Sequence, residues 1–158
     1  MKRSAALLVY KRSGSGIEVF LVHPGGPFWA QRDLGAWSIP KGGAEEGEDL
    51  IACALREMRE ELGPAPEVKP EEMVELGSVR QKGGKVVHAW AVEGDFDPAA
   101  LDSETFSLEW PPRSGNEREF PEVDRAEWLD PDRAREKLIE AQTAFVDRLL
   151  DHLGYSDR

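Results

Sequence analysis

Two stretches near the N-terminus are rich in apolar and β-branched residues. Residues 4–11 (SAALLVYK) and 17–23 (IEVFLVH) are both short, and serines and glycines at positions 13–16 separate them. Short apolar runs bounded by turn-forming residues are typical of buried strands. This pattern predicts two strands joined by a tight turn.

The segment 49–62 has the periodicity of an amphipathic helix. Its apolar residues recur three or four positions apart, which places them on one side of a helix. They are Ile51, Ala54, Leu55, Met58 and Leu62. Gly63 is a typical helix stop, and Pro64 cannot continue a helix. We therefore predict that the helix ends at Leu62.

The other segments predict further strands, loops and a C-terminal helix. Strands are expected at residues 37–39, 73–81, 85–92, 105–110 and 126–129, loops at 24–36 and 111–116, a glycine-rich turn at 41–47, and helix over 133–153. Residues 86–92 are almost continuously apolar, which favours a central strand. Because strands and helices do not alternate strictly, we predict an α/β fold with a mixed sheet flanked by helices, in a single domain spanning 1–158.

Composition narrows the partners that this domain can have. A net charge of −11, from 31 acidic and 20 basic residues, repels phosphate backbones and argues against binding to nucleic-acid duplexes. A multivalent cation would still allow a small anionic substrate. The single cysteine, Cys53, and the lack of a long apolar run predict a cytoplasmic protein without disulfides or membrane spans.

Three glutamates share one face of the predicted helix. At about 100° per residue, Glu57, Glu60 and Glu61 lie within a face roughly 100° wide, beside the apolar stripe rather than opposite it. Clustered like charges cost free energy unless a positive group compensates them. Hard cations such as Mg²⁺ or Mn²⁺ prefer oxygen ligands of this kind. The alternative interpretation is an ordinary solvated glutamate-rich face.

The residues upstream of these glutamates favour a metal site. The spacing of Gly, Glu, Arg-Glu, Glu-Glu and Gly is that of the Nudix box, which this sequence closely resembles. The matching positions are Gly42, Glu48, Arg56, Glu57, Glu60, Glu61 and Gly63, with Met58 at an aliphatic position. Chance agreement of these seven identities at one starting point is on the order of 10⁻⁸. Pro64 departs from the pattern, because an aliphatic residue is usual there.

The resemblance to the Nudix family implies a fold, an activity and a set of site residues. Family members form α/β/α sandwiches and use divalent metal to cleave nucleoside diphosphates linked to another group. By position, Glu57, Glu60 and Glu61 match metal-binding and water-activating glutamates, and the backbone carbonyl of Lys41 matches a further metal ligand. Glu48 and Arg56 match a supporting ion pair.

A fourth carboxylate is expected from the loop before Trp128. Glu122 is the best match for this ligand by position, with Glu119 and Glu117 as alternatives. In such enzymes either the first box glutamate or a late loop acid serves as general base. The sequence leaves the choice between Glu57 and Glu122 open.

The segment WSIPKG, which ends at Gly42, gives information on the substrate. It resembles members that hydrolyse diadenosine polyphosphates and members that remove oxidised nucleoside triphosphates, so Lys41 is a candidate phosphate contact. Arg113 and Arg118 are further candidates. Trp29, next to Phe28, is a candidate for stacking on a nucleobase, and packing under its own loop is the equal alternative. We therefore expect a small nucleotide substrate.

A catalytically inactive nucleotide sensor with the same fold is the alternative function. Members of that kind usually lack one of the box glutamates, whereas this chain keeps them all. Catalysis is therefore the favoured hypothesis. The sequence does not discriminate between a monomer and a dimer.

Overall fold

The computed structural model describes residues 3–63 and 68–155. The strands are β1 (Arg3–Ser13), β2 (Gly16–Pro24), β3 (Lys41–Gly43), β4 (Val74–Arg80), β5 (Val86–Glu93), β6 (Thr105–Glu109), β7 (Glu117–Pro121) and β8 (Val123–Leu129). The helices are α1 (Leu50–Leu62), α2 (Pro131–Lys137) and α3 (Thr143–Leu153). Short 3₁₀ turns occupy Pro70–Glu72, Lys82–Gly84, Pro98–Ala100 and Glu140–Gln142.

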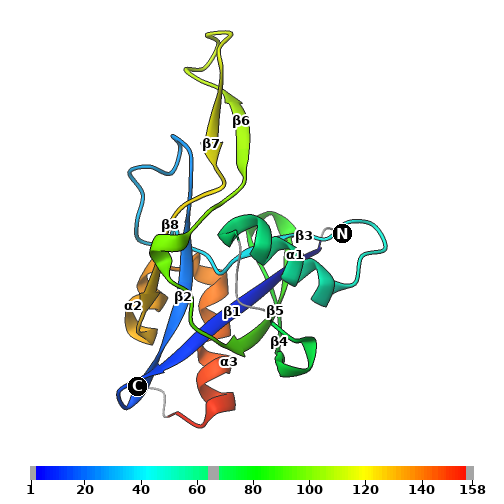
Figure 1. The fold of residues 1–158 in the computed structure, drawn as a ribbon, viewed down its shortest axis with the longest axis vertical. Helices are drawn as coiled ribbons and strands as arrows, with labels where there is room; N and C mark the ends of the chain where they lie inside the picture. Colours follow the sequence, from blue (N-terminus) through cyan, green and yellow to red (C-terminus); the bar gives the residue numbers. More distant parts are fainter. Residues whose placement is uncertain (1–2, 64–67, 156–158) are drawn as a thin grey trace.

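A mixed sheet with the order β4-β5-β1-β2-β8 forms the centre of the molecule (Figure 1). The pair β1–β5 is parallel, and the neighbouring pairs in this order are antiparallel. The other edge of β1 changes partner along its length: residues 4–6 pair with β3, and residues 10–13 pair with β2. The loop from Pro24 to Pro40 leaves the sheet where these two partners separate.

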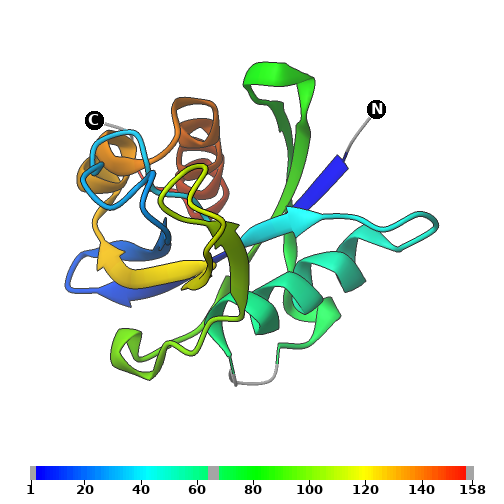
Figure 2. The same cartoon turned by 90° about the horizontal axis from the view of Figure 1, so that it is seen from above.

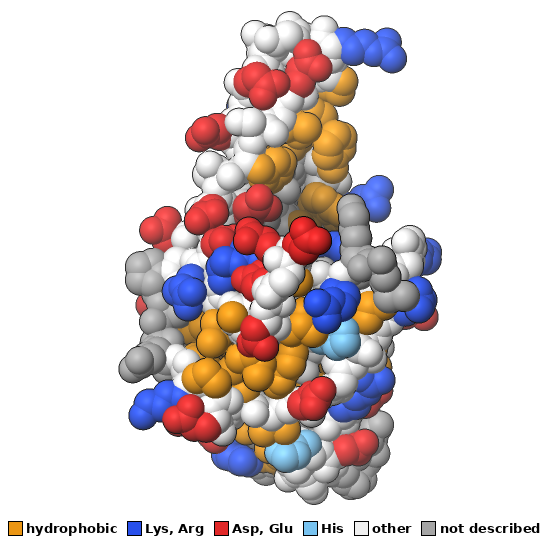
Figure 3. All heavy atoms as spheres, turned by 90° about the vertical axis from the view of Figure 1, so that its right-hand side faces the viewer, with side chains coloured by type: hydrophobic (Ala, Val, Ile, Leu, Met, Phe, Trp, Pro, Cys, Tyr) orange, Lys and Arg blue, Asp and Glu red, His pale blue; other side chains and the backbone are white. Residues whose placement is uncertain are grey.

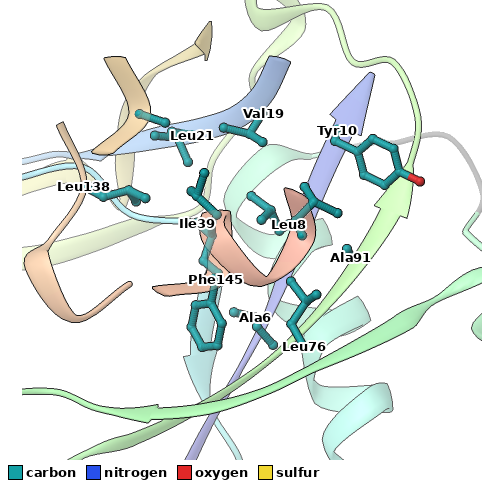
Figure 4. Packing of buried hydrophobic residues seen from close by; sticks show 14 of the residues in the cluster. Ala6, Leu8, Tyr10, Val19, Leu21, Ile39, Leu76, Ala91, Leu138 and Phe145 are labelled. Carbon is teal, nitrogen blue, oxygen red and sulfur yellow. The ribbon is translucent and has the colours of Figure 1, made fainter. Parts of the chain in front are cut away.

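Helices cover both faces of this sheet (Figure 2). On one face α1 packs over Leu7, Phe20 and Trp90. On the other face α2 and α3 cover a second cluster, in which Leu8, Ile39 and Phe145 lie together (Figure 4). Each face of the sheet has its own buried core, so the predicted mixed sheet flanked by helices is confirmed. Strand β5 lies between β4 and β1, so its predicted central position is also confirmed.

Residues 37–39 do not form the predicted strand. Ser38 makes one antiparallel bridge to Val22, and Trp37 makes one parallel bridge to Leu138. The next rung is missing because Pro40 has no amide hydrogen. The segment therefore crosses from β2 to the end of α2 instead of extending the sheet.

The predicted helix over 133–153 is interrupted in the middle. Helix α2 stops at Lys137, and the amide of Ile139 donates to the carbonyl of Trp37 at 2.8 Å. The amide of Trp37 also donates to the carbonyl of Lys137 at 2.9 Å, so these two backbone groups are not used to continue the helix and a tertiary contact overrides the local helical pattern. Helix α3 then begins at Thr143, with Phe145 and Leu149 buried.

Two further segments differ from the prediction. Part of the glycine-rich segment 41–47 is a strand, since Lys41–Gly43 pairs with β1. Residues 117–121, interpreted as part of a loop, form β7, which pairs only with β6. The β6–β7 hairpin projects from the end of the molecule (Figure 1). Within the described part of the chain, every helix is too short or too polar to cross a bilayer.

Candidate active site

Helix α1 is fixed at both ends by residues suited to those positions. The side chain of Asp49 accepts a hydrogen bond from the amide of Ala52 at 3.1 Å, as an N-cap does. Gly63 follows the helix with φ of 84°, and a Cβ at this position would lie 2.7 Å from the backbone oxygen of Asp102. Gly63 therefore allows both the positive φ and the close approach of the next segment. Pro64 lies outside the described residues.

The carboxylate of Glu57 lies against the backbone of Gly42. A Cβ added to Gly42 would be 1.9 Å from Cδ of Glu57, so a side chain at position 42 cannot coexist with this carboxylate position. The Glu57 side chain is only 13% exposed. The glycine of the box therefore leaves the space in which this carboxylate lies. Burial raises the pKa of Glu57, and the charge of Glu60 adds to that shift.

Arg56 is the hub of an ion-pair network. Its guanidinium binds both carboxylate oxygens of Glu48, each at 2.8 Å. The same group donates to Glu57 at 2.8 Å, to Glu60 at 3.1 Å and to the carbonyl of Gly43 at 3.2 Å. The pairing with Glu48 anchors the loop on the helix. The contacts with Glu57 and Glu60 offset part of the repulsion between these carboxylates.

We expect Arg56→Met to lower the melting temperature at neutral pH by a few degrees. Hydrogen bonding to Arg56 lowers the pKa of Glu48 from 4.5 to about 2. A carboxyl with a lowered pKa stabilises the fold above its ordinary pKa, and this contribution is lost as the pH falls through the folded-state value. The difference in melting temperature between wild type and variant should therefore be full above pH 4.5 and shrink toward pH 2.

Arg59→Met, at an exposed position of the same helix, provides the control, because Arg59 forms no ion pair with a carboxylate within residues 3–63 and 68–155. Thermal unfolding followed by circular dichroism across this pH range, without metal, measures both variants. A difference that stays constant with pH would mean that Arg56 acts through packing alone.

Glu61 lies at the junction between α1 and β3. One of its carboxylate oxygens accepts a hydrogen bond from the backbone amide of Lys41 at 3.3 Å. Burial raises the pKa of Glu61 to about 8, with the Lys41 ammonium opposing the shift and the Glu57 charge adding to it. Burial also lowers the pKa of the Lys41 ammonium, and Lys85 contributes in the same direction. The Glu61 carboxyl and the Lys41 ammonium therefore lie near each other in a poorly solvated region.

Backbone hydrogen bonds connect Glu122 to the end of α1. The amide of Glu104 donates to the carbonyl of Glu60 at 2.9 Å, and the amide of Glu122 donates to the carbonyl of Glu104 at 2.8 Å. The carbonyl of Glu122 in turn accepts from Gly25 at 3.0 Å. Burial raises the pKa of Glu122, and the charges of Glu104 and Glu60 raise it further. The loop acid is therefore held by its backbone near the helix carboxylates.

A cavity of about 220 Å³ joins these groups. Lys41, Glu61 and Glu122 line it, and Trp29 contributes an aromatic ring. The rest of its wall is mostly apolar: Val22, Pro24, Ala36, Ser38, Val123 and Ile139. A small, largely apolar cavity with a few converging charged groups is typical of a ligand site.

The protein-family comparison decides what this arrangement represents. The family model described as NUDIX domain matches residues 1–150. The chain belongs to the NUDIX domain family. The box read from the sequence is therefore the family's own motif, folded here as β3, the following loop and α1.

Similar proteins support the fold of this chain but do not identify its substrate. An RNA pyrophosphohydrolase of Rhodospirillum rubrum is 40% identical over 63 residues, which cover 38% of this NUDIX chain and 36% of that protein. A C. elegans Ap4A hydrolase structure has a TM-score of 0.64 at 19% identity, covering 98% of both chains. The NUDIX domain of Shewanella oneidensis NrtR, complexed with ADP ribose, has a TM-score of 0.63 at 16% identity, covering 96% of this chain and 87% of that one.

The NUDIX carboxylates are suitable donors for a hard divalent cation. Glu57, Glu60 and Glu61 all lie in the C-terminal half of α1 and offer carboxylate oxygens. Within residues 3–63 and 68–155, no three carboxylate, imidazole or thiolate groups are close enough to form a ready-made cage. Mg²⁺ usually keeps several waters and binds through one or two carboxylates plus substrate phosphates. The donor set therefore fits the ion without a preformed cage.

The structure separates the predicted site residues into two groups. Of the three acids considered for the fourth carboxylate, only Glu122 lines the cavity. Arg113 and Arg118, considered as phosphate contacts, lie exposed on the β6–β7 hairpin and do not line the cavity. Sequence reasoning missed Glu104, whose charge acts on Glu122, and Ile139, which comes from the break between α2 and α3. Neither position carries a sequence motif that indicates its role.

Proposed function

We propose that this protein is a metal-dependent pyrophosphohydrolase that cleaves a phosphoanhydride in a nucleoside diphosphate-linked substrate, either a dinucleoside polyphosphate or a nucleoside triphosphate. The observation that carries the proposal is the cavity itself. It places the half-buried Glu61 with Glu122, Lys41 and Trp29 at the end of a complete NUDIX helix. A polyphosphate needs cationic neutralisation, and a nucleoside needs an aromatic or apolar surface.

Each residue has a role that follows from its chemistry. Glu57, Glu60 and Glu61, with Glu122 and the Lys41 carbonyl, would hold Mg²⁺ or Mn²⁺. A bound divalent ion neutralises phosphate oxygens and lowers the pKa of water. Glu57 or Glu122 would take the proton from the attacking water. These roles match the residues that converge from α1, β3 and the β7–β8 junction.

Substrate binding falls to Lys41 and Trp29. The ammonium group of Lys41 lies in the electrostatic reach of Glu61, so a phosphate held by Lys41 would sit beside the carboxylates. Trp29 is 38% exposed, which leaves part of its ring free to stack on a nucleobase. Arg32 lies with its guanidinium carbon 5.7 Å from the centre of this ring, which adds a cation beside it.

A substrate panel tests the proposal. The protein is incubated with Mg²⁺ and dinucleoside polyphosphates, nucleoside triphosphates, ADP-ribose and nucleotide sugars, and products are separated by ion-exchange chromatography. Cleavage of a dinucleoside polyphosphate or a triphosphate supports the function, and heavy-oxygen water identifies the phosphorus attacked. Tight binding of one compound without cleavage of any would instead identify a nucleotide sensor.

A further inference from the structure

The β6–β7 hairpin has two chemically different faces. Phe106 and Leu108 alternate with exposed polar residues along β6, and Trp110 directly follows this strand. The paired strand places Phe120 opposite Phe106. On the reverse face are Ser107, Glu109, Glu117 and Glu119, all exposed. Figure 3 shows hydrophobic side chains along one side of the projecting hairpin and acidic side chains along the other. The hairpin is thus amphipathic although it stands apart from the main sheet.

The apolar face of the hairpin meets the loop that follows β2. The rings of Phe28 and Trp110 have centroids 5.5 Å apart at 86°, an edge-to-face contact. Phe106 lies so close to Gly26 that a Cβ there would be 2.9 Å from its ring. Phe28 nevertheless remains 61% exposed. None of these aromatic residues belongs to either core cluster of the described chain, so core packing does not account for them.

This aromatic surface is continuous with the cavity of the candidate active site. Phe28 precedes Trp29, which lines the cavity, and β7 ends one residue before Glu122, which also lines it. The bond from the amide of Gly25 to the carbonyl of Glu122 holds the loop and the hairpin base together at this point. The chain thus places Phe28, with its ring contact to Trp110, next to a residue of the cavity wall.

The cavity is too small for a complete two-nucleoside substrate. Its volume of about 220 Å³ is below the roughly 300–1,000 Å³ of sites that enclose a drug-sized ligand. One nucleoside with the adjoining phosphates would fill the space between Trp29 and Glu61. Any further nucleoside must lie outside, and the aromatic surface is the adjoining feature with rings available for stacking.

We propose that the face formed by Phe28, Trp110 and Arg118 stacks the second nucleoside of a dinucleoside polyphosphate. Bases stack on aromatic rings irrespective of their identity, and arginine adds a cation–π contribution. Arg118 lies on this face, with its guanidinium carbon 5.7 Å from the centre of the Phe120 ring. This inference rests on the proposed function and extends it from the bond cleaved to the group beyond that bond.

The charge distribution favours a small substrate over a polynucleotide. The reverse face of the hairpin is acidic, and the whole chain carries a net charge of −11. A long phosphate backbone running past the hairpin would be repelled. A dinucleoside polyphosphate concentrates its charge at the metal and places an uncharged nucleoside on the aromatic face.

Two substrates with the same phosphate chain test the inference. Diadenosine tetraphosphate carries the second nucleoside, and adenosine 5′-tetraphosphate lacks it. We expect Trp110→Leu to lower kcat/KM for diadenosine tetraphosphate by about 5- to 150-fold, the fold-change for loss of one stacked base. The value for adenosine tetraphosphate should not change. Trp110→Phe keeps a ring and should retain most of the preference.

Ser107→Ala provides the matched control, because Ser107 is exposed on the reverse face of the same hairpin. Circular dichroism verifies folding of each variant. Equilibrium binding of methylene-bridged analogues of both compounds repeats the comparison without hydrolysis. If no compound is cleaved but the analogue preference depends on Trp110, the proposed function fails while this inference stands.

Three results would overturn the inference. Equal losses for both tetraphosphates, or no loss for either, would mean that Trp110 does not contact a second nucleoside. A change in oligomeric state by light scattering, with equal losses, would make the aromatic face a contact between two copies of the chain. A 5′-triphosphorylated oligonucleotide that alone responds to Trp110→Leu would identify an RNA strand as the occupant.

Discussion

Replacing Glu61 with glutamine is expected to lower kcat by about 10²–10⁴-fold while the protein stays folded. Glutamine keeps the size of the side chain and can still accept the hydrogen bond from the amide of Lys41. It removes the negative charge that the proposed mechanism uses at the metal. The measurement is steady-state hydrolysis with saturating Mg²⁺ of whichever nucleotide the substrate panel identifies.

The same variant should be at least as stable as the wild type in the presence of a chelator. Burial raises the pKa of Glu61 from 4.5 to about 8, so the folded protein resists ionising this carboxyl. An acid with a raised pKa lowers stability as the pH rises from its unfolded value to its folded value, and glutamine removes that loss. The variant's advantage in melting temperature should therefore grow between pH 4.5 and 8.

Glu72→Gln removes an exposed glutamate elsewhere and is the control for net charge. Near-wild-type turnover of Glu61→Gln in Mg²⁺ would contradict the assignment of Glu61. Lost turnover together with a lowered melting temperature at pH 8 would indicate a folding defect instead.

Gly42→Ala is expected to lower kcat by about 10²-fold with little change in the free energy of unfolding. The new methyl group would occupy the position of the Glu57 carboxylate, 1.9 Å from its Cδ. A glutamate side chain can rotate away, so the fold tolerates the change. The carboxylate then no longer lies beside the loop, and a displacement of about 1 Å at a catalytic group is costly.

The adjacent Gly43 supplies a matched control, because a Cβ there meets nothing within 4 Å. Gly43→Ala should keep normal turnover and normal urea unfolding. If both alanine variants behave alike, the loss in Gly42→Ala comes from backbone stiffening and not from displacement of Glu57.

The parts of this molecule that the sequence could predict are those fixed by local spacing. The helix face carrying Glu57, Glu60 and Glu61 follows from helical periodicity, and the apolar strands β1, β2 and β5 follow from composition. The Glu48–Arg56 pair follows from the motif and exists in the structure. The additional contacts of Arg56 depend on side-chain conformation, which spacing does not determine.

The parts that the sequence could not predict depend on tertiary contacts. Strand β7 has a mostly charged sequence, and only pairing with β6 makes it a strand. The break between α2 and α3 lies where the carbonyl of Trp37, about a hundred positions earlier, accepts a hydrogen bond from the amide of Ile139. The cavity draws residues from both regions, so its apolar wall was not visible in the sequence.

The hydrogen bond between α1 and Glu104 determines how this part of the protein unfolds locally. The carbonyl of Glu60 would normally accept from the amide four residues later, but Pro64 has no amide hydrogen to give. The amide of Glu104 donates to the carbonyl of Glu60 instead, and the carbonyl of Glu104 accepts a hydrogen bond from the amide of Glu122. Local unfolding at the base of the hairpin would therefore leave a helix carbonyl unpaired. The end of α1 and the hairpin base should exchange their amide hydrogens as one cooperative unit.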